Sequence, residues 1–226
     1  MSDDSSKTVG RAAHLLFELA DNPDGLTVTE LAKLVNTQRA PLYRLLRTLS
    51  AYRLIRRDQN KLYFLSAGVL ELARAVAEPL GTLVRPVLQD LADSTNTTAM
   101  LVLSEGDALV TALNATPDTG EMHITTTIGF RHPDGPIATR IAIMAGRPAS
   151  PDDDPTVVEA RRKGYATSAS ATMVGRFGIA APVALGPSHP EGCILLVTFR
   201  EKTEAELAPH LTRAAALISS RFTVQR

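Results

Sequence analysis

The sequence is poor in the residues and runs on which several classes of protein depend. It contains one cysteine, Cys193, no tryptophan, and only six phenylalanines and four tyrosines among 226 residues. A single cysteine excludes an internal disulfide, as is usual in a reducing compartment. No apolar run approaches the roughly 18 residues that a membrane-spanning helix needs, and the polar start MSDDSSK does not resemble a secretory signal. We therefore expect a cytoplasmic protein without a membrane segment.

The chain also lacks the spacings that carry catalysis or metal binding. Its five histidines form no H-x-x-x-H pattern, a C-x-x-C pair is impossible, and G-x-S-x-G is absent. The glycines at 175 and 178 fit no phosphate-binding loop, and the acidic residues 152–154 are expected to cap the helix that follows them. Cys193 opens an apolar stretch and is expected in the core. We expect that the protein is not an enzyme and has no catalytic residue, metal or cofactor.

Charge is balanced over the whole chain but is unevenly distributed. The formal net charge is zero. Residues 36–61 nevertheless contain seven Arg or Lys and one acidic residue, whereas residues 80–226 contain 13 basic and 15 acidic residues. This distribution is typical of a small DNA-binding module joined to an acidic partner domain.

The most informative stretch is residues 37–49, TQRAPLYRLLRTL, which predicts an amphipathic helix. Its buried stripe would be formed by leucines at i, i+3, i+4 and i+7, namely Leu42, Leu45, Leu46 and Leu49. The opposite face is small and basic. A helix of this kind is typical of a recognition helix, whose first turn meets base edges in the major groove.

The residues before this helix predict the rest of a helix-turn-helix. Residues 7–20 have a helical apolar pattern, and strong turn residues at 22–25 end it. Thr27 and Glu30 fit a capping box at the start of a second helix. Asn36 then stands where a left-handed residue must turn the chain into the recognition helix.

The residues after the helix predict a hairpin, with short strands at 54–57 and 62–65, which would be the wing of a winged helix. We expect the wing to contact sugar and phosphate, Arg44 and Arg47 to contact guanine, and Gln38 to contact adenine. The candidate DNA-binding residues are Gln38, Arg39, Ala40, Tyr43, Arg44, Arg47, Arg56, Arg57 and Lys61. The alternatives are a helical domain with an incidentally basic surface and an adaptor whose winged domain binds protein.

The rest of the chain predicts a mixed domain. Helices are expected over 80–94 and 205–222, and strands over 98–103, 108–114, 122–128, 179–185 and 193–199. Short apolar runs of this kind suit the inside of a sheet that helices cover. With the helical first half, they predict an α+β protein whose C-terminal domain has a mostly antiparallel sheet.

Two stretches, RLLRTLSAYRLIRR at 44–57 and YFLSAGVLELARAV at 63–76, resemble the IclR family of bacterial transcriptional regulators. The resemblance implies a winged helix-turn-helix domain at 1–66, a linker helix at 67–79 with a break at Pro79, and a GAF-like effector-binding domain at 80–226. It also implies a homodimer, or a dimer of dimers, on a pseudo-palindromic operator of double-stranded DNA. We favour a repressor over an activator.

The resemblance continues into the C-terminal domain, for example in IGFRHP at 128–133 and IAAPV at 179–183. Carrying the family pocket over by position implies a small-molecule effector bound by Ile137, Ala138, Ser168, Ser170 and Thr198. Because Ser168 and Ser170 stand where the family commonly carries acidic residues, we expect an uncharged or weakly anionic aromatic or aliphatic metabolite. A degenerate pocket without an effector is the alternative.

Overall fold

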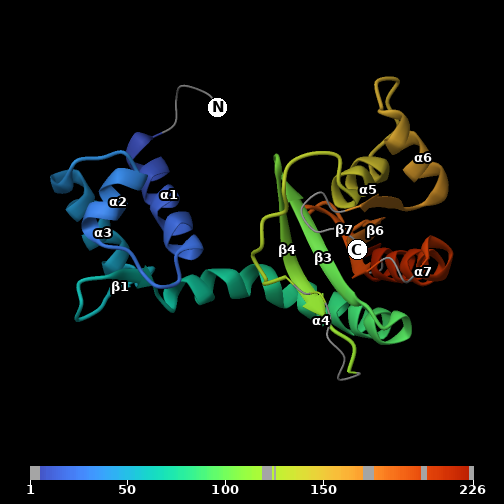
Figure 1. The fold of residues 1–226 in the computed structure, drawn as a ribbon, viewed down its shortest axis with the longest axis horizontal. Helices are drawn as coiled ribbons and strands as arrows, with labels where there is room; N and C mark the ends of the chain where they lie inside the picture. The colour runs from blue at the N-terminus through green and yellow to red at the C-terminus, as the bar shows by residue number, and fades with distance from the viewer. Residues whose placement is uncertain (1–5, 119–123, 125, 170–175, 200–202, 224–226) are drawn as a thin grey trace. The chain divides into compact units, whose positions relative to one another are not determined.

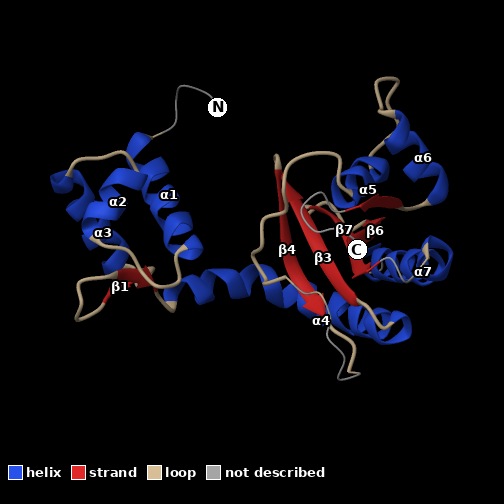
Figure 2. Ribbon diagram, in the orientation of Figure 1, coloured by secondary structure: helices blue, strands red, loops and turns tan. Residues whose placement is uncertain are grey.

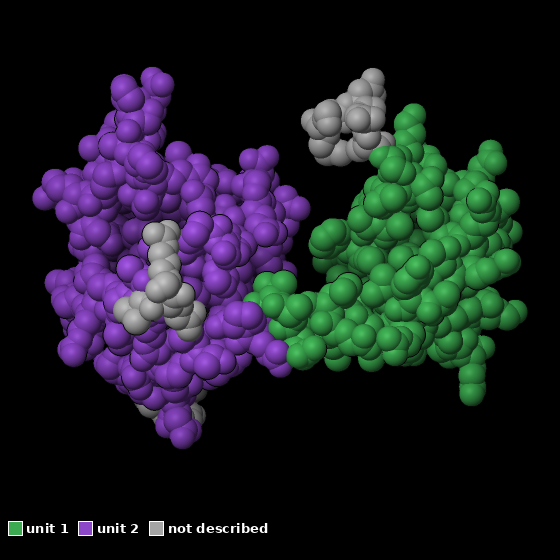
Figure 3. All heavy atoms as spheres, turned by 180° about the vertical axis from the view of Figure 1, so that it is seen from behind, with its two compact units in different colours: residues 1–76 green, residues 77–226 purple. Residues whose placement is uncertain are grey.

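The computed structural model describes residues 6–118, 124, 126–169, 176–199 and 203–223. The chain forms two compact units, which meet in the sequence between Val76 and Ala77 (Figure 1, Figure 3). Within the described residues, no helix is both long and apolar enough to cross a membrane.

Besides the beginning of a helix that continues into the second unit, the first unit contains three helices and a two-stranded antiparallel hairpin (Figure 2). In chain order these are α1 (Lys7–Asp21), α2 (Val28–Leu34), α3 (Arg39–Ala51), β1 (Ile55–Arg57) and β2 (Tyr63–Leu65). One leucine-rich core lies among them, and the side chains of Leu15, Leu31 and Leu42 are fully buried in it. The predicted helix-turn-helix and wing are confirmed.

The local signals of the sequence account for this arrangement. Thr27 Oγ1 accepts a hydrogen bond from the Glu30 backbone N–H at 3.3 Å, and the Glu30 carboxylate accepts one from the Thr27 backbone N–H at 2.8 Å. This reciprocal pair is the predicted capping box of α2. Asn36 has a φ of 44°, which confirms the predicted left-handed turn before α3. Tyr63 ties the wing to the start of α2 through backbone hydrogen bonds of 2.8 and 3.0 Å with Leu26.

The second unit is built on a five-stranded antiparallel sheet in the order β4-β3-β7-β6-β5. The strands are β3 (Thr98–Glu105), β4 (Ala108–Ala115), β5 (Ala166–Ala169), β6 (Arg176–Val183) and β7 (Glu191–Phe199). The helices are α4 (Gly68–Thr95), which belongs to this unit from Ala77 onward, α5 (Ala138–Gly146), α6 (Pro155–Lys163) and α7 (Glu204–Thr223). The predicted α+β class and the mostly antiparallel sheet are confirmed.

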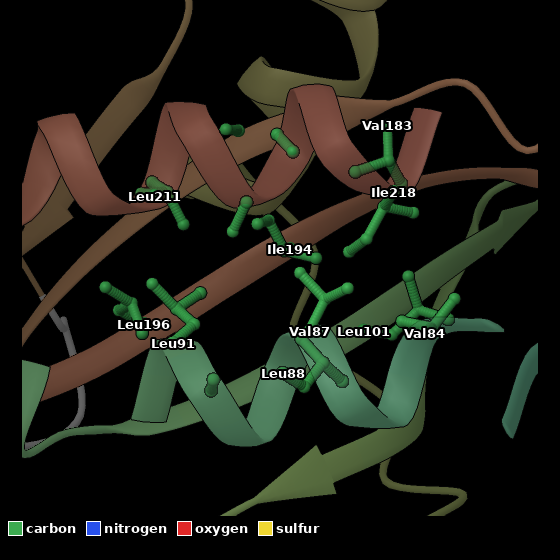
Figure 4. Packing of buried hydrophobic residues seen from close by; sticks show 14 of the residues in the cluster. Val84, Val87, Leu88, Leu91, Leu101, Val183, Ile194, Leu196, Leu211 and Ile218 are labelled. Atoms are coloured by element: carbon green, nitrogen blue, oxygen red, sulfur yellow. The ribbon is translucent and has the colours of Figure 1, made fainter. Parts of the chain in front are cut away.

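Helices cover both faces of this sheet, and each face has its own core. The second half of α4 and all of α7 pack on one face, where Val84, Leu88, Leu211 and Ile218 meet the strands (Figure 4). Helices α5 and α6 pack on the other face over a second cluster of buried side chains. Because side chains alternate along a strand, neighbouring residues of β7 belong to different cores.

Helix α4 contradicts the expected break at Pro79. It continues from Gly68 to Thr95 with Pro79 and Pro86 inside it. A proline removes one helical N–H and leaves the carbonyl four residues earlier without its usual partner. For Pro79 that carbonyl belongs to Ala75, which is exposed, so water can satisfy it. Burial of the following residues, from Leu80 onward, stabilises the continuation of the helix.

The sheet differs from the prediction at both of its edges. β5 was not expected, because its sequence ATSA is short and has small, partly polar side chains. Of the strand expected at 122–128, residues 122, 123 and 125 lie outside the described residues, and residues 124 and 126–128 form no strand. Along β4 there is instead an irregular stretch, in which the His132 N–H donates to the Leu109 carbonyl at 2.8 Å.

Candidate nucleic-acid interface and effector region

Helix α3 exposes the face that the sequence predicts. Its four stripe leucines are buried, whereas every candidate DNA-binding residue of the chain is exposed to solvent. The exposed set on α3 and its N-cap consists of Gln38, Arg39, Ala40, Tyr43, Arg44 and Arg47, and the wing adds Arg56, Arg57 and Lys61. Their role in DNA binding remains a prediction.

The arginines of α3 differ in their contacts with the rest of the protein. Arg39 Nη2 donates to Thr29 Oγ1 at 3.3 Å, which ties the start of α3 to α2. Arg44 and Arg47 form no ion pair within the described part of the chain. A guanidinium group without a carboxylate partner keeps its planar set of donors available for guanine or phosphate. The outer face of α3 is therefore well suited to contact DNA through Arg44 and Arg47.

The wing presents its arginines over aromatic rings. The Cζ atom of Arg56 lies 4.5 Å from the centroid of the Phe64 ring, and that of Arg57 lies 5.4 Å from the Tyr63 centroid. The hairpin turn is also defined, because Asp58 Oδ1 accepts a hydrogen bond from the Leu62 N–H at 2.8 Å. The wing is thus an ordered basic hairpin.

In the second unit, the structure brings together three of the five candidate effector residues. Ile137 is the N-cap of α5, and the N–H of buried Ala138 donates to Ser168 Oγ at 2.9 Å. This bond joins the start of α5 to the edge strand β5. Ser170 lies outside the described residues.

The expectation that Thr198 belongs to the same group is wrong. Across β5, β6 and β7, Ser168 lies opposite Gly178, and Gly178 lies opposite Val197. These three residues therefore share the face that α5 and α6 cover, where Val197 is buried. Thr198 is the next residue and points to the other face, opposite Phe177, which packs against the α4–α7 core. Similarity by position could not give this alternation, which depends on the strand register.

The line of paired residues that runs across the strands through Ser168, Gly178 and Val197 ends at Thr98, a residue that the sequence analysis did not identify as a candidate. Thr98 lies opposite Val197 and is completely buried. Among the residues that the structure describes, its Oγ1 has no hydrogen-bond partner, and neither has Oγ1 of buried Thr139 in the first turn of α5. Buried hydroxyls are rarely left without a partner, so these two groups are candidate contacts for a small molecule. A threonine at the start of an apolar strand gives no sequence signal of this kind.

A hollow in the described part of the second unit lies away from these residues. It has a volume of about 320 Å³ and is open to solvent between α6 and the edge strand β5. Ile141, Ala160 and Ala166 form its apolar floor, and Glu159 and Lys163 stand on its rim. None of the candidate effector residues lines it.

The one cysteine is no candidate nucleophile. Cys193 lies on β7 with no exposed surface, packed within the α5–α6 core. Burial raises the pKa of its thiol, so the reactive thiolate is disfavoured. The prediction that Cys193 is a core residue is confirmed.

A winged helix-turn-helix with an exposed basic helix face, in a chain that also contains a helix-covered antiparallel sheet, is an arrangement typical of DNA-binding regulators with a second domain. Comparison with known proteins narrows this class. Residues 8–59 match the IclR helix-turn-helix domain, and comparison with curated proteins finds no match. The chain therefore carries an IclR helix-turn-helix domain, and the resemblance to this family of transcriptional regulators is confirmed.

Solved structures of IclR regulators share the fold of the chain over almost all of its length. One, from Alicyclobacillus acidocaldarius, is 22% identical with a TM-score of 0.81 and covers 96% of this chain and 99% of its own. Another, from a Silicibacter species, is 20% identical with a TM-score of 0.81 and covers 95% and 96%. An IclR homologue from Microbacterium hydrocarbonoxydans, solved in complex with 4-hydroxybenzoate, is 13% identical with a TM-score of 0.79 and covers 96% and 99%.

Proposed function

We propose that this protein is a sequence-specific DNA-binding regulator of transcription, acting in the cytoplasm as a repressor and not as an enzyme. In this proposal residues 1–66 bind a pseudo-palindromic operator, residues 67–79 form the link, and residues 80–226 bind a small-molecule effector. A homodimer, or a dimer of dimers, places two recognition helices in successive major grooves about 10 base pairs apart or a multiple of that.

The observation that carries the proposal is the outer face of α3. Arg44 and Arg47 stand on it one turn apart, exposed and without carboxylate partners among the described residues. The leucines on the opposite face fix the orientation of the helix in its unit. A helix whose apolar face packs against its own unit and whose exposed face is basic can insert into the major groove of DNA.

The test is a binding titration with the full chain. Genomic fragments are selected on the immobilised protein, and the affinity of one selected fragment is then measured by fluorescence anisotropy over a series of salt concentrations. We expect log K to fall linearly with log salt, as phosphate contacts require. Arg44→Ala and Arg47→Ala should each weaken binding about 5- to 150-fold, the range for a lost bidentate base contact.

The matched control is Arg213→Ala. Arg213 is an exposed arginine of α7, outside the proposed interface, and its loss should leave the affinity unchanged. If the variants at 44 and 47 bind like the parent chain, the assignment of α3 is wrong. If no fragment binds at any salt concentration, the adaptor function is favoured.

For the second domain, we propose an uncharged or weakly anionic aromatic or aliphatic effector near the start of α5. The unpartnered hydroxyls of Thr98 and Thr139 and the neutral Ser168 support this class of ligand. Calorimetry on the full chain with 4-hydroxybenzoate and its uncharged methyl ester tests it. Binding restricted to cations or metal ions would overturn it.

Two variants locate the effector. Ser168→Ala removes a hydroxyl from the face covered by α5 and should weaken binding of whichever probe binds. Thr198→Ala removes one from the opposite face of the sheet and should leave binding unchanged. The reverse result would place the effector on the α4–α7 face.

A further inference from the structure

Phe64 in the wing touches both the turn before α2 and a surface arginine. Gly25 lies in that turn with a φ of +82°, and a Cβ atom on it would lie 2.5 Å from Phe64 Cζ and 2.6 Å from Cε1. The tip of the ring therefore abuts the Gly25 backbone. The guanidinium carbon of Arg56 lies over the face of the same ring, 4.5 Å from its centroid.

The strand register makes this contact specific to one arginine. Arg56 lies directly opposite Phe64 in the hairpin, and Arg57 lies opposite Tyr63. Neighbouring residues of a strand point to opposite faces, so Arg57 cannot share the face of the Phe64 ring. Both arginines are exposed, whereas Phe64 is half-buried.

We propose that Phe64 is a positioning residue, which holds the Arg56 guanidinium in one orientation for contact with a DNA backbone phosphate. This inference rests on the proposed DNA-binding function. A guanidinium stacked on an aromatic ring keeps its N–H donors in its own plane, pointing away from the ring and available to a phosphate. An arginine side chain that is not stacked loses conformational entropy when it binds a phosphate. Stacking on the ring restricts the side chain before binding, so less entropy is lost when the phosphate is bound.

A double-mutant cycle on the full chain tests the proposal. Phe64→Leu keeps an apolar side chain but removes the ring, and it should weaken operator binding about two- to fivefold, the range of an exposed cation–π contact. In the Arg56→Ala background, Phe64→Leu should have no further effect. The slope of log K against log salt should fall by about one for Arg56→Ala and stay unchanged for Phe64→Leu, because Phe64→Leu removes no charge.

Arg57→Ala is the matched control, because Arg57 is a wing cation on the other face of the hairpin. In this background Phe64→Leu should retain its full two- to fivefold effect, since the two side chains do not share a contact. An effect of Phe64→Leu that persists in the Arg56→Ala background would overturn the proposal and indicate a structural role.

A measurement without DNA separates this inference from the proposed function. In the free protein, the NMR order parameter of the Arg56 side-chain Nε–H should fall on Phe64→Leu, while that of Arg57 should not change. An unchanged Arg56 order parameter would overturn the positioning role even if the operator is bound. A different result would be that the parent chain binds no DNA, while Phe64→Leu still lowers the order parameter of Arg56. That result would overturn the proposed function and the phosphate contact that rests on it.

Discussion

Two buried threonines on the sheet of the second unit differ in their hydrogen bonding. Thr98 and Thr111 both have no exposed surface. Thr111 Oγ1 lies 3.0 Å from His132 Nε2 and 3.3 Å from Thr126 Oγ1, whereas Thr98 Oγ1 has no hydrogen-bond partner in the described part of the chain. A hydroxyl that has left water without gaining a hydrogen bond lowers the stability of the fold.

We therefore predict opposite effects for the same substitution at these two positions. Thr98→Val should raise the free energy of unfolding by about 1 kcal/mol, because it removes an unsatisfied hydroxyl and keeps the shape. Thr111→Val should lower it by about 1–3 kcal/mol, because it removes the hydrogen bonds that Thr111 forms with buried His132 and half-buried Thr126. Urea denaturation of the ligand-free chain measures both, and a loss of stability in Thr98→Val would show that Thr98 is satisfied in solution.

The capping box of α2 makes the stability of the first unit depend on pH. Hydrogen bonds from the side chain and backbone of Thr27 lower the pKa of the Glu30 carboxyl below its ordinary value of 4.5. A carboxyl whose pKa is lower in the folded state stabilises the fold above the unfolded pKa, and this contribution is lost as the pH falls through the folded pKa.

We predict that Glu30→Gln is less stable than the parent chain at pH 7 and that the difference shrinks as the pH falls from about 4.5 through the lower pKa that Glu30 has in the folded state. Glutamine keeps a hydrogen-bond acceptor at the position, so the difference reports the charge of the carboxylate alone. Thermal unfolding over a pH series measures it. A difference that does not change with pH would show that the charge of Glu30 makes no contribution.

Pro79 destabilises the first part of α4, where few side chains pack against other elements. None of the side chains from Val69 to Pro79 is buried in the described structure. Proline in a helix interior costs about 3 kcal/mol relative to alanine, because it removes an N–H donor and crowds the preceding turn. Pro79→Ala should therefore slow hydrogen exchange of the amides around residue 79.

Pro86→Ala serves as the comparison for this helix. Val84, Val87 and Leu88 are buried around Pro86, so packing already supports that turn, and exchange there should change less. Equal effects at the two prolines would mean that tertiary packing does not stabilise the second half of α4.

The elements of the first unit could be predicted almost completely, because their signals are local. The capping box at Thr27, the left-handed Asn36 and the leucine stripe of α3 each act within a few residues of the chain. Strand β5 and the face of Thr198 depend instead on which strands pair and in which register. The helix break expected at Pro79 does not occur, because burial of the side chains from Leu80 onward outweighs the unfavourable helix propensity of Pro79.

The same distinction applies to the candidate sites. The cations of α3 and the wing could be identified from the sequence, because a surface residue needs only the correct helical face or strand position. The unpartnered hydroxyls of Thr98 and Thr139 could not, because they are defined by the absence of a neighbour that only the packed fold reveals.

At the scale of the whole molecule, the proposed homodimer needs apolar surface that a single chain leaves exposed. In α4, Leu72 is 62% exposed and Val76 is 58% exposed, one helical turn apart on the same face. In α1, Val9 is 67% exposed and Phe17 is 72% exposed. Exposed large apolar side chains that gather on one face, as Leu72 and Val76 do, are typical of surfaces that bind another protein.

We predict that Leu72→Gln and Val76→Gln together raise the dimer dissociation constant at least tenfold. Burial of one such side chain contributes about 1.5–3 kcal/mol, and each 1.4 kcal/mol is a factor of ten in affinity. Sedimentation equilibrium measures self-association, and operator affinity should fall with it, because a twofold operator requires two recognition helices. Val158→Gln is the control, since Val158 is 52% exposed on α6 of the second unit and is not part of the proposed surface. A monomeric wild-type chain would overturn the homodimer, and dissociation by Val158→Gln alone would move the interface to α6.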